Sequence, residues 1–147
     1  MILLAISTAC AGTFFGAAVY INLVEHPARM ACGQELALRE FGPSYARASV
    51  MQGGLAVAGC LTGLAAAWLL RDGGVLGAAV LLGLILPFTL IVIFPTNKQL
   101  SAPSLDSTSE AAAGLLARWN RLHAVRGILS GLAFVLLLYR LVSGGAV

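Results

Sequence analysis

Hydrophobic residues fill four long stretches of this chain, and most polar residues collect between them. The stretches cover residues 2–23, 50–70, 74–94 and about 122–142, and the first three contain no charged side chain. About 20 consecutive apolar residues suffice for a helix to cross the hydrocarbon core of a bilayer. The pattern therefore predicts an all-α fold, with residues 1–147 forming a single membrane domain of four packed transmembrane helices.

Two glycines four residues apart occur in or beside each predicted span. The pairs are Gly12/Gly16, Gly59/Gly63, Gly73/Gly77 and Gly127/Gly131. Small residues at this spacing let helix backbones approach closely in lipid. We expect close helix packing through these faces, within the bundle or between copies of the chain in a homo-oligomer.

The connections between the spans differ in length. A turn at residues 71–73 joins spans two and three, whereas residues 25–49 and 95–121 form two long, partly polar connections. Their spacing of apolar residues predicts amphipathic helical segments at the membrane surface. We expect a helix break beside Pro27 and Pro43 in the first turn of the next helix.

The second long connection contains its own start signal. Ser107 and Glu110 have the spacing of a capping box, which predicts that a long helix begins there and runs into span four.

Basic residues favour one orientation. Seven of them lie in the long connections or just beside them, and two lie at the other side: Arg29, Arg39, Arg47, Lys98, Arg118, Arg121 and Arg126 against Arg71 and Arg140. The positive-inside rule then predicts cytoplasmic long connections and both termini outside. Eight of the nine basic residues are arginine, which suggests a GC-rich bacterial genome and therefore the cytoplasmic membrane of a bacterium.

Composition supports the membrane assignment. The chain is 59% hydrophobic and 10% charged, whereas soluble domains average about 25% charged residues. The net charge of +3 comes from scattered residues, so no nucleic-acid-binding patch is indicated. Cys10, Cys32 and Cys60 lie far apart, which indicates neither a zinc site nor a redox dithiol.

The two halves of the chain have a similar layout. Residues 1–73 and 74–147 each read as span, Pro-containing polar motif, amphipathic segment and span. Two hairpins related by an axis along the membrane normal would explain this layout.

The predicted topology brings four polar motifs to the same end of the bundle. They are Glu25, His26 and Arg29 after span one, Tyr45 and Arg47 before span two, Thr96 and Asn97 after span three, and Trp119, His123 and Arg126 before span four. Trp119, His123 and Arg126 are spaced i, i+4 and i+7, so they share one helix face. Ionisable side chains at this depth usually face the bundle interior.

Each motif also has a simpler structural interpretation. Glu25 and Arg29 have the spacing of an ion pair within a helix. Pro95-Thr96-Asn97 is typical of a helix end. Trp119 and Arg126 could be interfacial anchors, and His26 a solvated interfacial residue.

These motifs, in this order, resemble the anthrone oxygenase-like family. The resemblance is carried by Glu25-His26-Pro27-Ala28-Arg29, by Pro95-Thr96-Asn97 and by Trp119-x-x-x-His123-x-x-Arg126. It implies a small four-helix membrane protein, in a family whose members mostly form a domain of unknown function. Characterised members are implied to oxidise anthrones of polyketide pathways to anthraquinones with molecular oxygen.

The residue types fit this chemistry. A neutral imidazole near pH 7 suits a general base, for which we favour His123 over His26. Arg29 and Arg126 would stabilise an enolate oxygen. The flat substrate would be bound by Trp119, Tyr45, Tyr20, Asn97, Thr96 and Glu25.

This mechanism needs no cofactor, but other functions stay open. His26, His123 and Glu25 could instead hold a non-haem iron or copper ion. A small-molecule transporter or channel, or a scaffold subunit without its own catalysis, is the alternative from another class.

Overall fold

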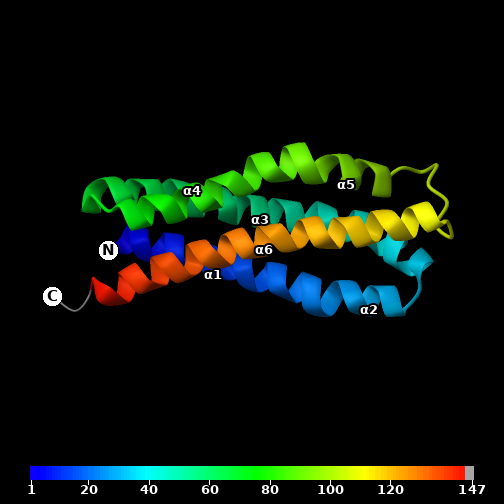
Figure 1. Cartoon of the computed structure of the whole chain (residues 1–147), viewed down its shortest axis with the longest axis horizontal. Coiled ribbons are helices and arrows are strands. Elements are labelled where there is room, and N and C mark those ends of the chain that lie inside the picture. Colours follow the sequence, from blue (N-terminus) through cyan, green and yellow to red (C-terminus); the bar gives the residue numbers. More distant parts are fainter. Residues whose placement is uncertain (145–147) are drawn as a thin grey trace.

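Four helical rods lie side by side in the computed structural model, which describes residues 1–144 (Figure 1). The rods are α1 (Ile2–Tyr20), η1 (Ile21–Glu25) and α2 (His26–Ala31); α3 (Gln34–Leu70); α4 (Gly73–Phe88), η2 (Thr89–Ile93) and α5 (Phe94–Leu100); and α6 (Glu110–Ser143). The segments η1 and η2 are single π-helical turns inside otherwise α-helical rods. All four rods are long and apolar enough to cross a membrane, and the described residues contain no strand. The predicted four-helix, all-α fold is confirmed.

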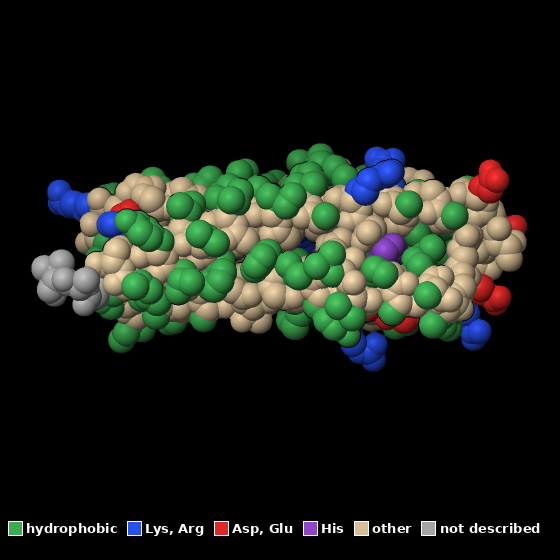
Figure 2. Space-filling model, turned by 60° about the horizontal axis from the view of Figure 1, so that its bottom comes forward, with side chains coloured by type: hydrophobic (Ala, Val, Ile, Leu, Met, Phe, Trp, Pro, Cys, Tyr) green, Lys and Arg blue, Asp and Glu red, His purple; other side chains and the backbone are tan. Residues whose placement is uncertain are grey.

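The two ends of the bundle differ. The N-terminus, the C-terminal end of α6 and the α3–α4 turn lie at one end, which we call the termini end. The α2–α3 and α5–α6 connections lie at the other, the connection end (Figure 1). On the face in Figure 2, charged side chains gather towards these two ends and apolar side chains cover the band between them. This distribution is that of a multi-pass membrane protein.

The rods are longer than the predicted spans because the polar segments continue the helices. The predicted break beside Pro27 is wrong, since Pro27 is the second residue of α2, directly after the η1 turn. Pro95 likewise is the second residue of α5, after η2, so the expected helix end there is also wrong. Proline is tolerated at the start of a helix, where its missing N–H has no helical partner to lose. Each proline follows a π turn and so occupies the first turn of a new α-helical segment, while the rod as a whole stays continuous.

Two helix starts also differ from expectation. Pro43 lies inside α3 and not in its first turn, because Gly33, with φ of +103°, lets the chain turn and start the helix earlier. The side-chain amide of Gln34 then donates to the carbonyls of Ser107 and Ser109, at 2.7 and 2.8 Å. The cap of α6 is Ser109, not Ser107, and its hydroxyl accepts a backbone N–H in the first turn.

Glycines bring the rods together at the predicted faces. A Cβ added to Gly12 would lie 2.8 Å from the ring of Phe134, and one added to Gly131 would lie 2.8 Å from the ring of Phe15. The two rings stack with centroids 6.5 Å apart, so each helix seats an aromatic ring of the other. Close contacts also occur at Gly59 and Gly63, whereas Gly16, Gly73 and Gly77 have nothing within 4 Å. The homo-oligomer expected from these faces stays a prediction.

Candidate functional site

The connection half of the bundle buries polar side chains from all four rods. The exposed fraction of each of these side chains lies between 0% and 8%. The residues are His26, Arg29, Gln52, Thr96, Asn97, His123 and Arg126. Burying such groups in a membrane-spanning bundle is costly, and it usually marks a functional interior.

A hydrogen-bond chain fixes the orientation of the His123 ring. The backbone carbonyl of Asn120 can only accept, and the side-chain nitrogen of Asn22 donates to it at 2.8 Å. The Asn22 side-chain oxygen therefore faces His123, whose Nδ1 lies 2.8 Å away and must carry the hydrogen. In the neutral ring, Nε2 is then the nitrogen with a free lone pair.

One indole ring contacts both histidines. The centroid of Trp119 lies 4.9 Å from the His123 ring and 5.8 Å from the His26 ring. Phe41 meets the indole edge-on at 5.4 Å and stacks on Tyr45 at 5.8 Å. The structure thus brings both imidazoles to one place inside the bundle.

The two buried arginines have different partners. Arg29 forms ion pairs with Glu25, one turn before it, and with Glu40 of α3. In the second pair, Arg29 Nε lies 2.9 Å from Glu40 Oε2, but the orientation is not that of a hydrogen bond. Arg126 donates to the neutral Gln52 at 2.7 Å, and its guanidinium lies 5.2 Å from the centroid of Phe14. Among residues 1–144, no carboxylate forms an ion pair with Arg126. Of these two buried arginines, Arg126 is the one whose charge no carboxylate of residues 1–144 neutralises, so it is free for an anionic ligand.

A small cavity lies among these side chains. Its volume of about 20 Å³ is room for a single water molecule. Its lining includes six predicted site residues: Glu25, Arg29, Tyr45, Trp119, His123 and Arg126.

The other four predicted site residues lie outside the cavity lining. Tyr20 is 56% exposed on the outer surface of the bundle. His26 packs against Trp119, and Thr96 and Asn97 are buried on α5.

Several buried polar atoms have no hydrogen-bond partner within the described part of the chain. They include His26 Nδ1, Thr96 Oγ1, both side-chain heteroatoms of Asn97, Gln52 Nε2 and Arg126 Nε. Each such atom costs about 1–3 kcal/mol when it is left unpaired. Of these residues, only Gln52 and Arg126 line the cavity.

The alternative metal-ligand set, His26, His123 and Glu25, is not grouped in the described structure. Over residues 1–144, no three His, Cys, Asp or Glu side chains are grouped so that they could hold a metal ion. The Glu25 carboxylate instead accepts from Arg29 and, at 3.2 Å, from the Ser44 hydroxyl.

Two residues that orient the site, Asn22 and Gln52, are not among the site residues predicted from the sequence. Asn22 and Gln52 are lone amide side chains in otherwise apolar spans. That isolation is a usable signal, because an amide in a membrane span needs a hydrogen-bond partner.

A family model described as anthrone oxygenase matches residues 41–136, about two thirds of the chain. The matched range includes Pro95-Thr96-Asn97 and Trp119 to Arg126, and it begins after the 25–29 motif. No curated protein and no solved structure matches the chain.

Proposed function

Because the chain belongs to the anthrone oxygenase family, we propose that it is a membrane-embedded oxidoreductase that oxidises an anthrone-type, fused-ring phenol with molecular oxygen. The observation that carries the proposal is the oriented His123 ring, with Nδ1 tied to Asn22, in the same cavity as the unpaired charge of Arg126. A base and a fixed positive charge side by side are what an acidic carbon substrate requires.

The first step is deprotonation. His123 Nε2 takes a proton from the ring CH₂ opposite the substrate carbonyl, and the electron pair moves through the rings to the carbonyl oxygen. Arg126 stabilises the resulting enolate oxygen, and it keeps its own charge at any physiological pH. A water-poor interior makes this attraction stronger than it would be in solvent.

Oxygen then supplies the oxidant. The carbanion transfers electrons to O₂ and forms a carbon–oxygen bond, and the peroxide anion takes back the proton held by His123. Loss of the second ring proton and cleavage of the O–O bond leave a new carbonyl and one water. Overall, an anthrone and O₂ give an anthraquinone and water, and no other oxidant or reductant is consumed.

Substrate binding uses the remaining side chains. Trp119 and Tyr45 offer ring faces in the cavity. Thr96 and Asn97 lie outside its present lining, and their unpaired atoms would bind phenol or carbonyl oxygens once the cavity widens towards α5. Arg29 is held between two carboxylates, so its role is to position Glu25. Ligand pockets usually measure roughly 300–1,000 Å³, so the cavity must widen when the substrate enters.

We also propose that the connection end faces the cytoplasm, since it carries seven of the nine basic residues.

Oxygen consumption tests the proposal directly. The purified chain in lipid nanodiscs should consume one O₂ per anthrone oxidised and form the anthraquinone, above the rate of empty nanodiscs. His123→Ala should lower kcat by about 100-fold or more, and His26→Ala should lower it much less. Circular dichroism establishes that both variants keep their helix content. If the wild-type chain does not exceed the empty nanodiscs, the proposed reaction is wrong.

A further inference from the structure

A groove on the outer surface of the bundle lies directly beside the cavity. It runs between the first rod and α3 and has a volume of about 580 Å³. Its lining is Ala17, Tyr20, Ile21, Glu25, Glu40, Pro43, Ser44, Arg47, Ala48 and Met51. Four of these residues, Ile21, Glu25, Ser44 and Ala48, also line the cavity. These four shared residues form the wall between the groove and the cavity that His123 lines.

The lining of the groove combines apolar and polar side chains. Ala17, Ile21 and Met51 offer apolar surface, while Glu40 and Arg47 are charged. Tyr20, 56% exposed, adds an aromatic ring with a hydroxyl at its edge. This arrangement suits a flat aromatic molecule with a polar oxygen, and the groove volume is typical of small-molecule sites.

At η1 itself the wall is held by one weak hydrogen bond, whereas one turn further on the Arg29–Glu40 ion pair joins α2 to α3. Across it, the Ser44 hydroxyl of α3 donates to the Glu25 carboxylate of η1 at 3.2 Å, which is long for such a bond. One side of the wall is the η1 turn itself, and π turns often occur at functional positions in helices. A small outward shift of η1 would join groove and cavity without disturbing the glycine-packed half of the bundle.

We propose that this groove is the outer binding site and entrance through which a fused-ring phenol dissolved in the membrane reaches His123. The inference rests on the proposed function for the identity of the ligand. It explains why the cavity holds only about 20 Å³ while 580 Å³ lies on the other side of the wall: the substrate binds first outside and enters when η1 moves.

Ligand-binding kinetics test the entrance without relying on turnover. The chain has two tryptophans, so Trp68→Phe leaves Trp119 as the sole indole in the background protein. Stopped-flow quenching of Trp119 by 1,8-dihydroxyanthraquinone in nanodiscs then reports arrival beside His123. Ala17→Phe fills the groove without touching the cavity lining. The matched control is Gly16→Phe on the adjacent residue, where an added Cβ meets nothing within 4 Å.

The entrance predicts opposite effects from two variants. Ala17→Phe should slow association and dissociation together by about tenfold, with little change in Kd, whereas Gly16→Phe should behave as the background. Ser44→Ala removes the bond across the wall and should speed both rates by about three- to tenfold. Equal rates for Ala17→Phe and Gly16→Phe, with the dye binding normally, would overturn the entrance and leave the proposed reaction intact. If the variants change the dye-binding rates as predicted but the chain does not oxidise anthrone, the proposed reaction is wrong and the entrance stands. If the background protein does not bind the dye at all, the proposed entrance is wrong.

Discussion

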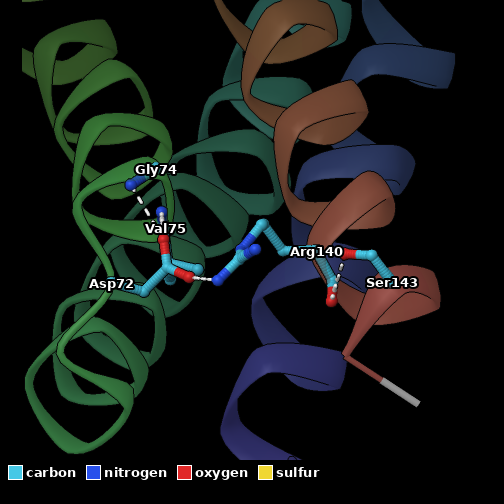
Figure 3. A network of polar contacts seen from close by, with 5 residues as sticks. All are labelled: Asp72, Gly74, Val75, Arg140 and Ser143. Atoms are coloured by element: carbon cyan, nitrogen blue, oxygen red, sulfur yellow. Dashed lines mark hydrogen bonds and ion pairs between the residues drawn. The ribbon is translucent and has the colours of Figure 1, made fainter. Parts of the chain in front are cut away.

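Two arginines on the same helix, Arg126 and Arg140, lie in opposite halves of the bundle and in opposite circumstances. Arg140 is 46% exposed at the termini end and pairs with Asp72, which also caps α4 by accepting the N–H groups of Gly74 and Val75 (Figure 3). Arg126 is 7% exposed, and its hydrogen bond goes to the neutral Gln52. The Arg140 charge takes part in an ion pair, while the Arg126 charge is buried without a counter-charge from residues 1–144.

The different surroundings of the two arginines indicate a role in stability for Arg140 and a role in function for Arg126. The pair at the cap of α4, whose arginine is half exposed, contributes modestly to stability and needs no ligand. A buried guanidinium without a carboxylate is unfavourable for folding, and an apolar replacement of similar volume is often neutral or stabilising. Retaining such a group is understandable if an anion binds there during the reaction, as the enolate of the proposed mechanism would.

The largest expected effect comes from replacing Arg126. Arg126→Met should lower kcat by about 100- to 1,000-fold, because the enolate loses its fixed positive charge. Its thermal unfolding temperature should be unchanged or higher, since a buried charge has been removed. Anthrone-dependent oxygen uptake and circular dichroism melting in detergent measure the two quantities.

Arg140→Met is the matched control on the same helix. It should leave kcat within about twofold while lowering the unfolding temperature slightly. The distinction between the two arginines fails if both variants lose activity equally, or if Arg126→Met unfolds the protein at a lower temperature than Arg140→Met.

A smaller loss is expected from Asn22, which acts through His123. Asn22→Leu removes the acceptor that holds Nδ1–H, and kcat should fall by about tenfold with KM nearly unchanged. Asn120→Ala is the comparison variant: it removes the side-chain oxygen that accepts from Asn22 at 2.6 Å but keeps the backbone carbonyl at 2.8 Å, which still orients the Asn22 amide, so its effect on kcat should be small. A fall in Asn120→Ala as large as in Asn22→Leu would contradict the assigned ring orientation.

The functional end was partly predictable from the sequence. Apolar runs of spanning length determine which polar motifs meet at one end, so the meeting of Trp119, His123 and Arg126 with Glu25 and Arg29 followed from topology. Helix spacing placed the first three on one face, and the structure lines the cavity with them.

The π turns were not predictable in this way. A π turn shifts the hydrogen bonding of one helical turn and has no sharp residue signature, so Pro27 was wrongly taken as a break. The partners Asn22 and Gln52 depend on how the rods rotate against one another, which glycine contacts between distant residues determine. Hydropathy along the chain contains no direct measure of that rotation.

At the termini end, the effects should be on stability alone. Asp72→Ala removes both the cap of α4 and the pair with Arg140, which should destabilise the fold by about 1–2 kcal/mol and leave oxygen uptake unchanged. Detergent melting curves of the variant and the wild type check this value. A clear loss of kcat would show that the two ends of the bundle are coupled.

Asp72→Asn should have the smallest effect, and it divides the two roles of Asp72. The asparagine oxygen can still accept from the Gly74 and Val75 N–H groups, since asparagine caps helices about as well as aspartate, so only the ion pair to Arg140 is lost. Because Arg140 is half exposed, the expected loss is at most about 1 kcal/mol, and it should shrink further as salt is raised. Combining Asp72→Asn with Arg140→Met in a double-mutant cycle isolates the pair. A coupling well above that value, insensitive to salt, would mean that this ion pair is screened from solvent like the buried charges of the connection half, and the contrast between the two arginines would then be one of position only.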